Sequence, residues 1–254
     1  KIAHNPEDRI LLAKLWDKIS NAIRRSIPGS TGFLSPREQE MARFLFGDYP
    51  GLATFGGYEG AERKILCWLP EYLEADWLRS EDSPLICLRA TFYEGDHPNH
   101  RDFLGALMGA GISRECVGDI LIGNGACDFF VTKEIAPYLL QNFCSAGRTK
   151  CRLSPIALSE ISVPELKVLE IRDTLASLRL DSAISAGFRI SRTAAHQYIS
   201  AGKASVNGLP CEKPDKAVEE GMVLSVRGLG KIKLHSVGGQ TKKGRISVLI
   251  HRYV

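Results

Sequence analysis

The chain has 254 residues, 44% of them hydrophobic and 24% charged, which is the composition of a globular protein large enough for two or three domains. No apolar run approaches the roughly 18 residues of a membrane-spanning helix, and residues 1–8 have no apolar signal core, so we expect a cytoplasmic protein without a membrane partner. Residues 1–150 hold 17 Lys and Arg against 20 Asp and Glu, whereas residues 151–254 hold 16 against 9, a charge of −3 beside one of +7. A basic carboxyl-terminal part suits contact with a polyanion, although a solvated lysine-rich surface is the alternative.

Residues 1–83 are predicted to form a small mixed module of helices and strands. Apolar side chains recur at helical spacing over residues 6–27. Ser35, Pro36 and Glu38 have the pattern of an N-cap, a first-turn proline and a capping-box acid, and so predict a second helix that ends near residue 46. A turn at residues 55–58 and a strand over residues 63–69 complete the module.

Residues 84–163 predict a ferredoxin-like domain. Strands are expected at residues 85–93, 119–122, 126–131 and 149–156, with helices at residues 100–109 and 133–143, and this βαββαβ order defines that fold. RNA-recognition motifs share the order and stack bases on aromatic side chains of the sheet. Phe129 and Phe130 are adjacent, point to opposite faces and lack the basic and aromatic consensus of such motifs. An RNA-binding role and a purely structural role for this domain both stay open.

Residues 164–254 predict a compact αL-type module of two helices and a small β-sheet, which makes the whole chain an α+β protein. After strand-like stretches in residues 166–177, a helix is expected over residues 179–186, with Gly187 as its positive-φ stop. Ser191 can cap a second helix that reaches residue 201, where Gly202 ends it. Three further strands are expected at residues 223–227, 231–235 and 245–253.

The candidate RNA-binding residues lie on the outward face of the second helix, on the alternating strand after it, or in the basic turns nearby. Arginine can fork across phosphate oxygens, lysine acts as a point charge, and neutral polar side chains fix the register on RNA, so shape-led binding is expected. His196 can instead be an ordinary polar surface residue that binds nothing, and the basic turn at residues 242–245 can instead be a solvated loop. The candidates are Arg179, Arg189, Ser191, Arg192, Thr193, His196, Gln197, Lys203, Ser205, Asn207, Arg227, Lys231, Lys242, Lys243 and Arg245.

Three motifs in this region share their order and spacing, over about 50 residues, with one known domain. They are Arg179-Leu180-Asp181, Ser191-Arg192-Thr193-Ala194, and Gly202-Lys203 followed by Val206-Asn207-Gly208. In these motifs the chain resembles the RNA-binding domain named after the small-subunit ribosomal protein S4. It departs from that domain at Ala204, where a bulkier β-branched residue is usual.

Further motifs are spread over all three predicted modules. They are Phe55-Gly56-Gly57-Tyr58, residues 61–64, His100-Arg101-Asp102-Phe103-Leu104-Gly105, Arg114-Glu115, Gly118-Asp119-Ile120, residues 176–181 and residues 241–245. In these motifs the chain resembles the bacterial YlmH family, with a departure at Leu229, where a basic residue is expected. The resemblance implies an RNA-binding protein of the bacterial cytoplasm that associates with the large ribosomal subunit and tRNA and helps to rescue stalled ribosomes. Some members of the family are tied to cell division or to photosystem assembly.

Two other function classes are alternatives. An RNA-modifying enzyme, such as a pseudouridine synthase, methyltransferase or tRNA synthetase, would need a catalytic motif, but Asp102 and Asp119 stand in none, and the glycines at residues 123–125 suit a hairpin. His97 and His100 lack further ligands at a suitable spacing, and the seven scattered cysteines are expected to be reduced and mostly buried. We therefore expect no catalytic residue, no metal and no cofactor. A cell-division-linked adaptor whose first modules bind a protein is the remaining alternative, and a monomer that binds rRNA and tRNA is the main expectation.

Overall fold

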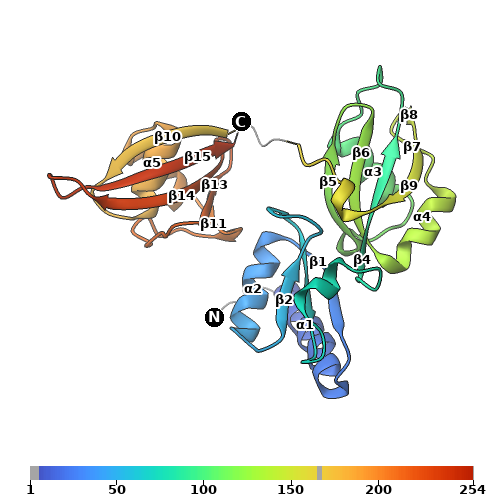
Figure 1. Cartoon of the computed structure of the whole chain (residues 1–254). Coiled ribbons are helices and arrows are strands. Elements are labelled where there is room, and N and C mark those ends of the chain that lie inside the picture. Colours follow the sequence, from blue (N-terminus) through green and yellow to red (C-terminus); the bar gives the residue numbers. More distant parts are fainter. Residues whose placement is uncertain (1–5, 165–167, 254) are drawn as a thin grey trace. The chain divides into compact units, whose positions relative to one another are not determined.

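The protein forms two compact units, one up to Pro164 and one from Glu165 onward (Figure 1). The computed structural model describes residues 6–164 and 168–253, and the α+β class expected from the sequence is confirmed. We call these parts the amino-terminal and carboxyl-terminal units. The finer division into three domains, with a boundary at residue 83, stays a prediction. No helix among the described residues has the length and apolar content needed to cross a membrane.

The first part of the amino-terminal unit packs two helices on a three-stranded antiparallel sheet of order β1-β3-β2. The elements are α1 (Pro6–Arg25), β1 (Gly29–Leu34), α2 (Pro36–Phe46), β2 (Leu52–Phe55), β3 (Lys64–Trp68) and the 3-10 helix η1 (Ala75–Arg79). The capping box before α2 is confirmed, because the backbone N–H of Ser35 donates to Glu38 at 2.6 Å. Strands β1 and β2 were not predicted.

The second part has the expected ferredoxin-like architecture. Its antiparallel sheet has the order β5-β6-β4-β9, which is the strand arrangement that a βαββαβ chain gives in this fold. The predicted helix over residues 133–143 is divided into a 3-10 turn and α4, and the predicted last strand is divided in two. The elements are β4 (Leu85–Thr91), α3 (His100–Gly109), η2 (Arg114–Cys116), β5 (Val117–Ile122), β6 (Ala126–Thr132), η3 (Lys133–Ile135), α4 (Ala136–Asn142), β7 (Ser145–Ala146), β8 (Thr149–Lys150), β9 (Arg152–Ile156) and η4 (Leu158–Glu160).

Both faces of this sheet are covered. Phe129 packs against Phe103 of α3, whereas Phe130 on the opposite face stacks on Tyr58 with ring centroids 5.5 Å apart. The two phenylalanines have no exposed surface. Neither can therefore stack on a base as the aromatic residues of an RNA-recognition motif do.

The turn at residues 55–58 holds the two parts of this unit together. Asp119 of β5 accepts hydrogen bonds from the Tyr58 hydroxyl at 2.9 Å and from the backbone N–H groups of Glu62 and Arg63 at 2.6 and 3.0 Å. Gly57 has a φ of +96°, and a Cβ atom there would lie 2.0 Å from the Phe130 ring. The glycine is required both by its backbone conformation and by the lack of space.

The carboxyl-terminal unit places two helices on a six-stranded sheet of order β10-β15-β14-β13-β11-β12, as the sequence predicted in outline (Figure 1, orange to red). Leu180, Ile184 and Ile199 of the helices are fully buried in its core. The elements are β10 (Val168–Leu175), α5 (Leu180–Phe188), α6 (Arg192–Ser200), β11 (Ala204–Val206), β12 (Leu209–Pro210), β13 (Val223–Val226), β14 (Gly230–Gln240) and β15 (Ile246–Tyr253).

Gly187 does not end the first of these helices, so that prediction was wrong. It lies inside α5, where a Cβ atom would come within 2.5 Å of Ile232 Cδ1. The residue is glycine because the helix packs closely on β14, and the left-handed residue that follows the helix is Arg189, with a φ of 54°.

All seven cysteines are free thiols, but only Cys67, Cys87 and Cys127 are buried, so the prediction that most of them are buried was wrong. Burial raises the pKa of Cys67 and Cys87 to about 12. These two side chains therefore stay protonated near neutral pH and serve as small apolar core residues.

Candidate nucleic-acid interface

Helix α6 presents the predicted polar face to solvent. Ser191 caps the helix by accepting a hydrogen bond from the backbone N–H of Ala194 at 3.1 Å, and Ala195 and Ile199 anchor its inner side in the core. Five side chains on the other side are exposed, and two of them contact each other, since His196 Nδ1 lies 3.3 Å from Ser200 Oγ. The exposed residues are Arg192, Thr193, His196, Gln197 and Ser200.

The start of α6 is tied to the start of α5 through one carboxylate. Asp181 accepts a hydrogen bond from Arg192 Nη2 at 2.8 Å and lies 3.3 Å from Arg179 Nε, while its own side chain is only 7% exposed. Burial alone raises the pKa of Asp181, but the hydrogen bond and charge of Arg192, with the charge of Arg179, lower it overall. The Arg192 side chain is still 55% exposed, so it is held in place and yet faces solvent.

Sequence reasoning did not mark Asp181 as a site residue. The sequence did offer a signal, because Asp181 stands in the first turn of a predicted helix, two residues after Arg179 and eleven before Arg192.

A second cationic position lies at the other end of α6. The chain turns at Gly202, and exposed Lys203 places its ammonium group 5.6 Å from the Tyr198 ring centroid. The backbone N–H of Arg227 donates to the carbonyl of Lys203 at 2.9 Å, which brings a second cation beside it. A helix of nine residues is about 13 Å long at 1.5 Å per residue, so cations flank the polar face of α6 at both ends.

Ser205 and Lys231 lie on the sheet face that points away from the helices. Both pair with Ser225 of β13, whereas the neighbouring Ala204 and Val206 are buried, as the alternation predicted. The sequence analysis did not name Lys233 as a candidate. It lies on the same face, two residues after Lys231, and the two-residue alternation of a strand would have identified it.

Asn207 stabilises the turn after β11. It adopts a φ of 48°, and its Oδ1 accepts a hydrogen bond from the backbone N–H of Val223 at 2.9 Å. The amide nitrogen and the second lone pair of Oδ1 can still contact a ligand.

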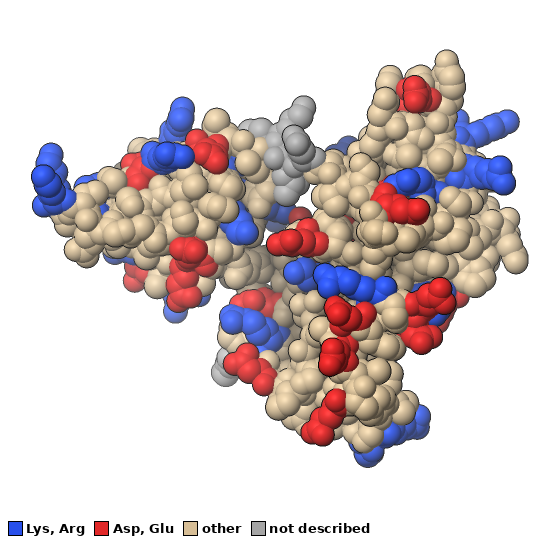
Figure 2. All heavy atoms as spheres, viewed as in Figure 1, with Lys and Arg blue, Asp and Glu red and all other residues tan. Residues whose placement is uncertain are grey.

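The basic residues of the last hairpin point in two directions. Lys242 and Lys243 are exposed in the turn between β14 and β15, and Figure 2 shows basic side chains gathered at that tip of the carboxyl-terminal unit. Arg245 is instead bound to β10, because its guanidinium donates to Thr174 Oγ1 at 2.9 Å and to the Thr174 carbonyl. The predicted loop is also shorter than expected, since β14 continues to Gln240.

Asp102 and Asp119, the candidate catalytic carboxylates, accept hydrogen bonds that stabilise the fold of the amino-terminal unit. Asp119 accepts the three hydrogen bonds described above, and Asp102 closes the capping box of α3 by accepting from the backbone N–H of Asn99 at 2.8 Å. In the described ranges, 6–164 and 168–253, no three His, Cys, Asp or Glu side chains gather as metal ligands would.

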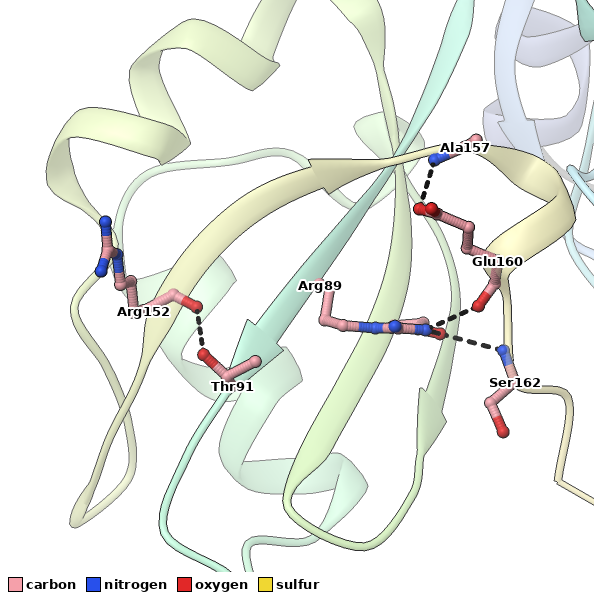
Figure 3. A network of polar contacts seen from close by, with 7 residues as sticks. Arg89, Thr91, Arg152, Ala157, Glu160 and Ser162 are labelled. Carbon is pink, nitrogen blue, oxygen red and sulfur yellow. Dashed lines mark hydrogen bonds and ion pairs between the residues drawn. The ribbon is translucent and has the colours of Figure 1, made fainter.

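Arg89 helps to hold the last residues of the same unit by donating to the carbonyl of Glu160 (Figure 3). Arg89 makes two hydrogen bonds of 2.7 Å to Asp128, which is 3% exposed, and one of 2.8 Å to the carbonyl of Glu160. Asp128 also accepts from the backbone N–H of Ser162 at 3.2 Å. This ion pair therefore attaches residues 160–162 to the sheet.

Comparison with known proteins identifies related sequences over most of the chain. A family model described as "Putative RNA-binding domain in YlmH" matches residues 96–160, and the S4 domain model matches residues 178–224. The "Ribosome-associated protein quality control protein P2" of Bacillus subtilis (strain 168) is 36% identical over 225 residues, which span 87% of this chain and 86% of that protein. The structure titled "Cell division protein ylmH from Streptococcus pneumoniae" covers 64% of this chain and 98% of its own, with a TM-score of 0.51 and 19% identity, and so shares its fold.

Proposed function

We propose that this chain, which belongs to the YlmH family, is a non-catalytic protein that binds structured RNA. It carries the RNA-binding domain of that family and an S4 domain. The observation that carries the proposal is the exposed polar face of α6, with Arg192 at one end and Lys203 at the other. The family resemblance stated from the sequence motifs is confirmed.

The geometry suits backbone recognition of folded RNA. An A-form helix displays phosphates and 2′-hydroxyls across a wide, shallow minor groove. Arg192 is fixed by Asp181 and can fork across phosphate oxygens, while Thr193 and Gln197 offer neutral hydrogen bonds between the two cationic ends. A rigid face of this kind reads shape and register more than sequence.

The partner we propose is the large ribosomal subunit with its tRNA, during the rescue of stalled ribosomes. The Bacillus subtilis relative is a ribosome-associated quality control protein by name, and its similarity extends over both units of this chain. The structural bonds of Asp102 and Asp119 support binding without catalysis. We expect the protein to act as a monomer in the cytoplasm, where ribosomes are found.

Sedimentation with purified ribosomal subunits tests the proposal. Wild-type protein should sediment with large subunits, and an Arg192→Ala/Lys203→Ala variant should stay in the supernatant. The matched control is Arg43→Ala/Arg79→Ala, which removes two arginines of the amino-terminal unit whose side chains are 67% and 64% exposed. Equal sedimentation of wild type and the α6 variant would contradict the interface.

A second measurement addresses catalysis. The protein is incubated with transcribed rRNA and tRNA, and modified nucleosides are mapped. We expect none, and a new modification in stoichiometric yield would show an RNA-modifying enzyme instead.

A further inference from the structure

A hollow of about 330 Å³ lies in the carboxyl-terminal unit where β10 ends, α5 ends and α6 begins. Apolar side chains line part of it, among them Leu175, Ala186 and Ile190. Among the residues that the structure describes, Arg189, Arg192 and Arg245 line it as well, against one lining carboxylate, that of Asp173. The hollow is therefore apolar in one part and cationic in another.

Two of these guanidinium groups are held in fixed planes. Arg192 is bonded to Asp181, and Arg245 is bonded to Thr174 through both its Nε and Nη2 atoms. Arg189 is exposed and follows the last turn of α5. A fixed guanidinium plane offers a surface on which a flat ring can stack, and its outward N–H groups can still reach an anion.

The size of the hollow favours a ligand larger than a single anion. It is about ten times the roughly 30 Å³ that one water molecule occupies in the liquid, and it lies at the low end of the range of small-molecule pockets. A phosphate alone would leave the apolar lining uncovered. A ligand with a flat, weakly polar ring and an attached anionic group would cover both parts.

We propose that this hollow receives one unpaired nucleotide of the bound RNA, with its base against the apolar lining and its phosphate on the arginines. Unstacked bases in loops and bulges are the usual target of base-contacting RNA-binding proteins, and arginine planes are common stacking partners for them. The inference rests on the proposed function and adds to it a preference for RNA with an unpaired nucleotide next to the stem that α6 binds.

The site reaches beyond the segment matched by the S4 domain model. That match ends at residue 224, and it begins at residue 178, so Thr174, Leu175 and Arg245 lie outside it. Strands β10 and β15 pair along their whole length, from Val168 with Tyr253 to Leu175 with Ile246. These two strands complete the hollow in this chain.

The test compares two RNA hairpins, one with a single bulged nucleotide in its stem and one without it. Their affinities for the full-length protein are measured by fluorescence anisotropy at one salt concentration. Wild type should prefer the bulged hairpin by about tenfold, in the range that stacking of one base gives. Ala176→Trp, which fills the hollow from an exposed lining position without changing charge, should bind both hairpins equally and as well as wild type binds the plain one.

Leu169→Trp is the matched control, because it adds the same side chain to a half-exposed position of β10 outside the hollow, and it should keep the preference. Arg245→Lys keeps the charge and removes a planar group on which a base can stack, so it should also lower the preference for the bulged hairpin. It replaces Ala176→Trp in the test if that variant does not fold. Equal binding of both hairpins by wild type, or a preference kept by both hollow variants, would overturn the inference and leave the proposed function standing.

Two further outcomes separate the possible failures. Binding of neither hairpin by wild type would contradict the proposed function and the inference together. A free nucleoside monophosphate that binds wild type, and not Ala176→Trp, without RNA present would overturn RNA as the source of the nucleotide.

Discussion

Asp181 at the start of α5 and Arg192 at the start of α6 form one hydrogen-bonded ion pair, with Nη2 and Oδ2 2.8 Å apart. The acid is buried and the base is half exposed, so the pair connects the starts of the two helices and leaves part of the guanidinium group facing solvent. An arginine that is already ordered loses less conformational entropy when it binds a phosphate.

Asp181→Asn should therefore destabilise the carboxyl-terminal unit by about 2 kcal/mol near pH 7, because Arg192 then faces a neutral amide in place of the buried carboxylate. The pKa of Asp181 is lowered in the folded protein from its ordinary value of 3.8, so its stabilising effect is present above that pH and is lost as the pH falls below it. The free-energy difference between wild type and variant should shrink on acidification below about pH 4. Urea unfolding followed by circular dichroism at several pH values measures this, and a difference that stays constant at low pH would contradict it.

Removal of the two cations that flank α6 should flatten the salt dependence of RNA binding. For Arg192→Ala/Lys203→Ala, the slope of log affinity against log salt should fall by roughly 0.7 to 0.9 for each lost phosphate contact. Anisotropy titrations of a structured rRNA or tRNA fragment at several KCl concentrations provide the slope. The Arg43→Ala/Arg79→Ala variant should keep the wild-type slope, and an unchanged slope in the α6 variant would show that neither side chain binds phosphate.

Gly57→Ala should unfold or strongly destabilise the amino-terminal unit, by about 3–5 kcal/mol, because it combines backbone strain with overlap on the Phe130 ring. Gly60→Ala is the matched control, since its φ is +85° and no heavy atom of the described residues lies within 4 Å of the added Cβ, and only a strain of about 1–2 kcal/mol is expected. All three tryptophans, Trp16, Trp68 and Trp77, lie in this unit, so denaturation followed by tryptophan fluorescence reports on it alone. Equal losses in the two variants would mean that the ring contact is unimportant.

Gly187→Ala and Gly105→Ala add the same methyl group to two helices and should change the free energy of unfolding in opposite directions. Gly105 of α3 is exposed, and no heavy atom in the described part of the chain lies within 4 Å of the added Cβ, so alanine should stabilise the fold by about 0.5–1 kcal/mol. In α5 the added Cβ meets fully buried Ile232, and a net loss of about 1–3 kcal/mol is expected. Urea denaturation gives both values, and stabilisation by Gly187→Ala would disprove close packing of α5 on β14.

Local signals predicted much of this fold. The capping box at Ser35 and Glu38 and the Ser191 cap lie within a few residues of the helices they begin, so nearby sequence is sufficient to identify them. The alternation around Ala204 and Val206 likewise identified the buried side of β11. The exposed face of α6 follows from the same kind of periodicity.

The features that sequence reasoning missed depend on distant neighbours. Strand β1 contains Gly29 and Gly32, which look like turn residues, yet a Cβ at Gly29 would lie 2.4 Å from Ala22 Cβ and one at Gly32 would lie 2.6 Å from the carbonyl oxygen of Glu115. The role of Gly187 depends in the same way on Ile232, 45 positions further along the chain. The hollow beside α6 needs Arg245 from the last hairpin, and no local pattern connects that residue to Arg192.

Arg189 shows a compromise between folding and binding. Its left-handed conformation, which glycine would adopt without strain, costs an arginine roughly 1 kcal/mol or more. An exchange to glycine is thus a simple stabilising mutation, and a search guided by stability alone would select it. If the side chain contacts RNA as we expect, the more stable protein would be the weaker binder, and a thermostable version of this unit should keep the arginine.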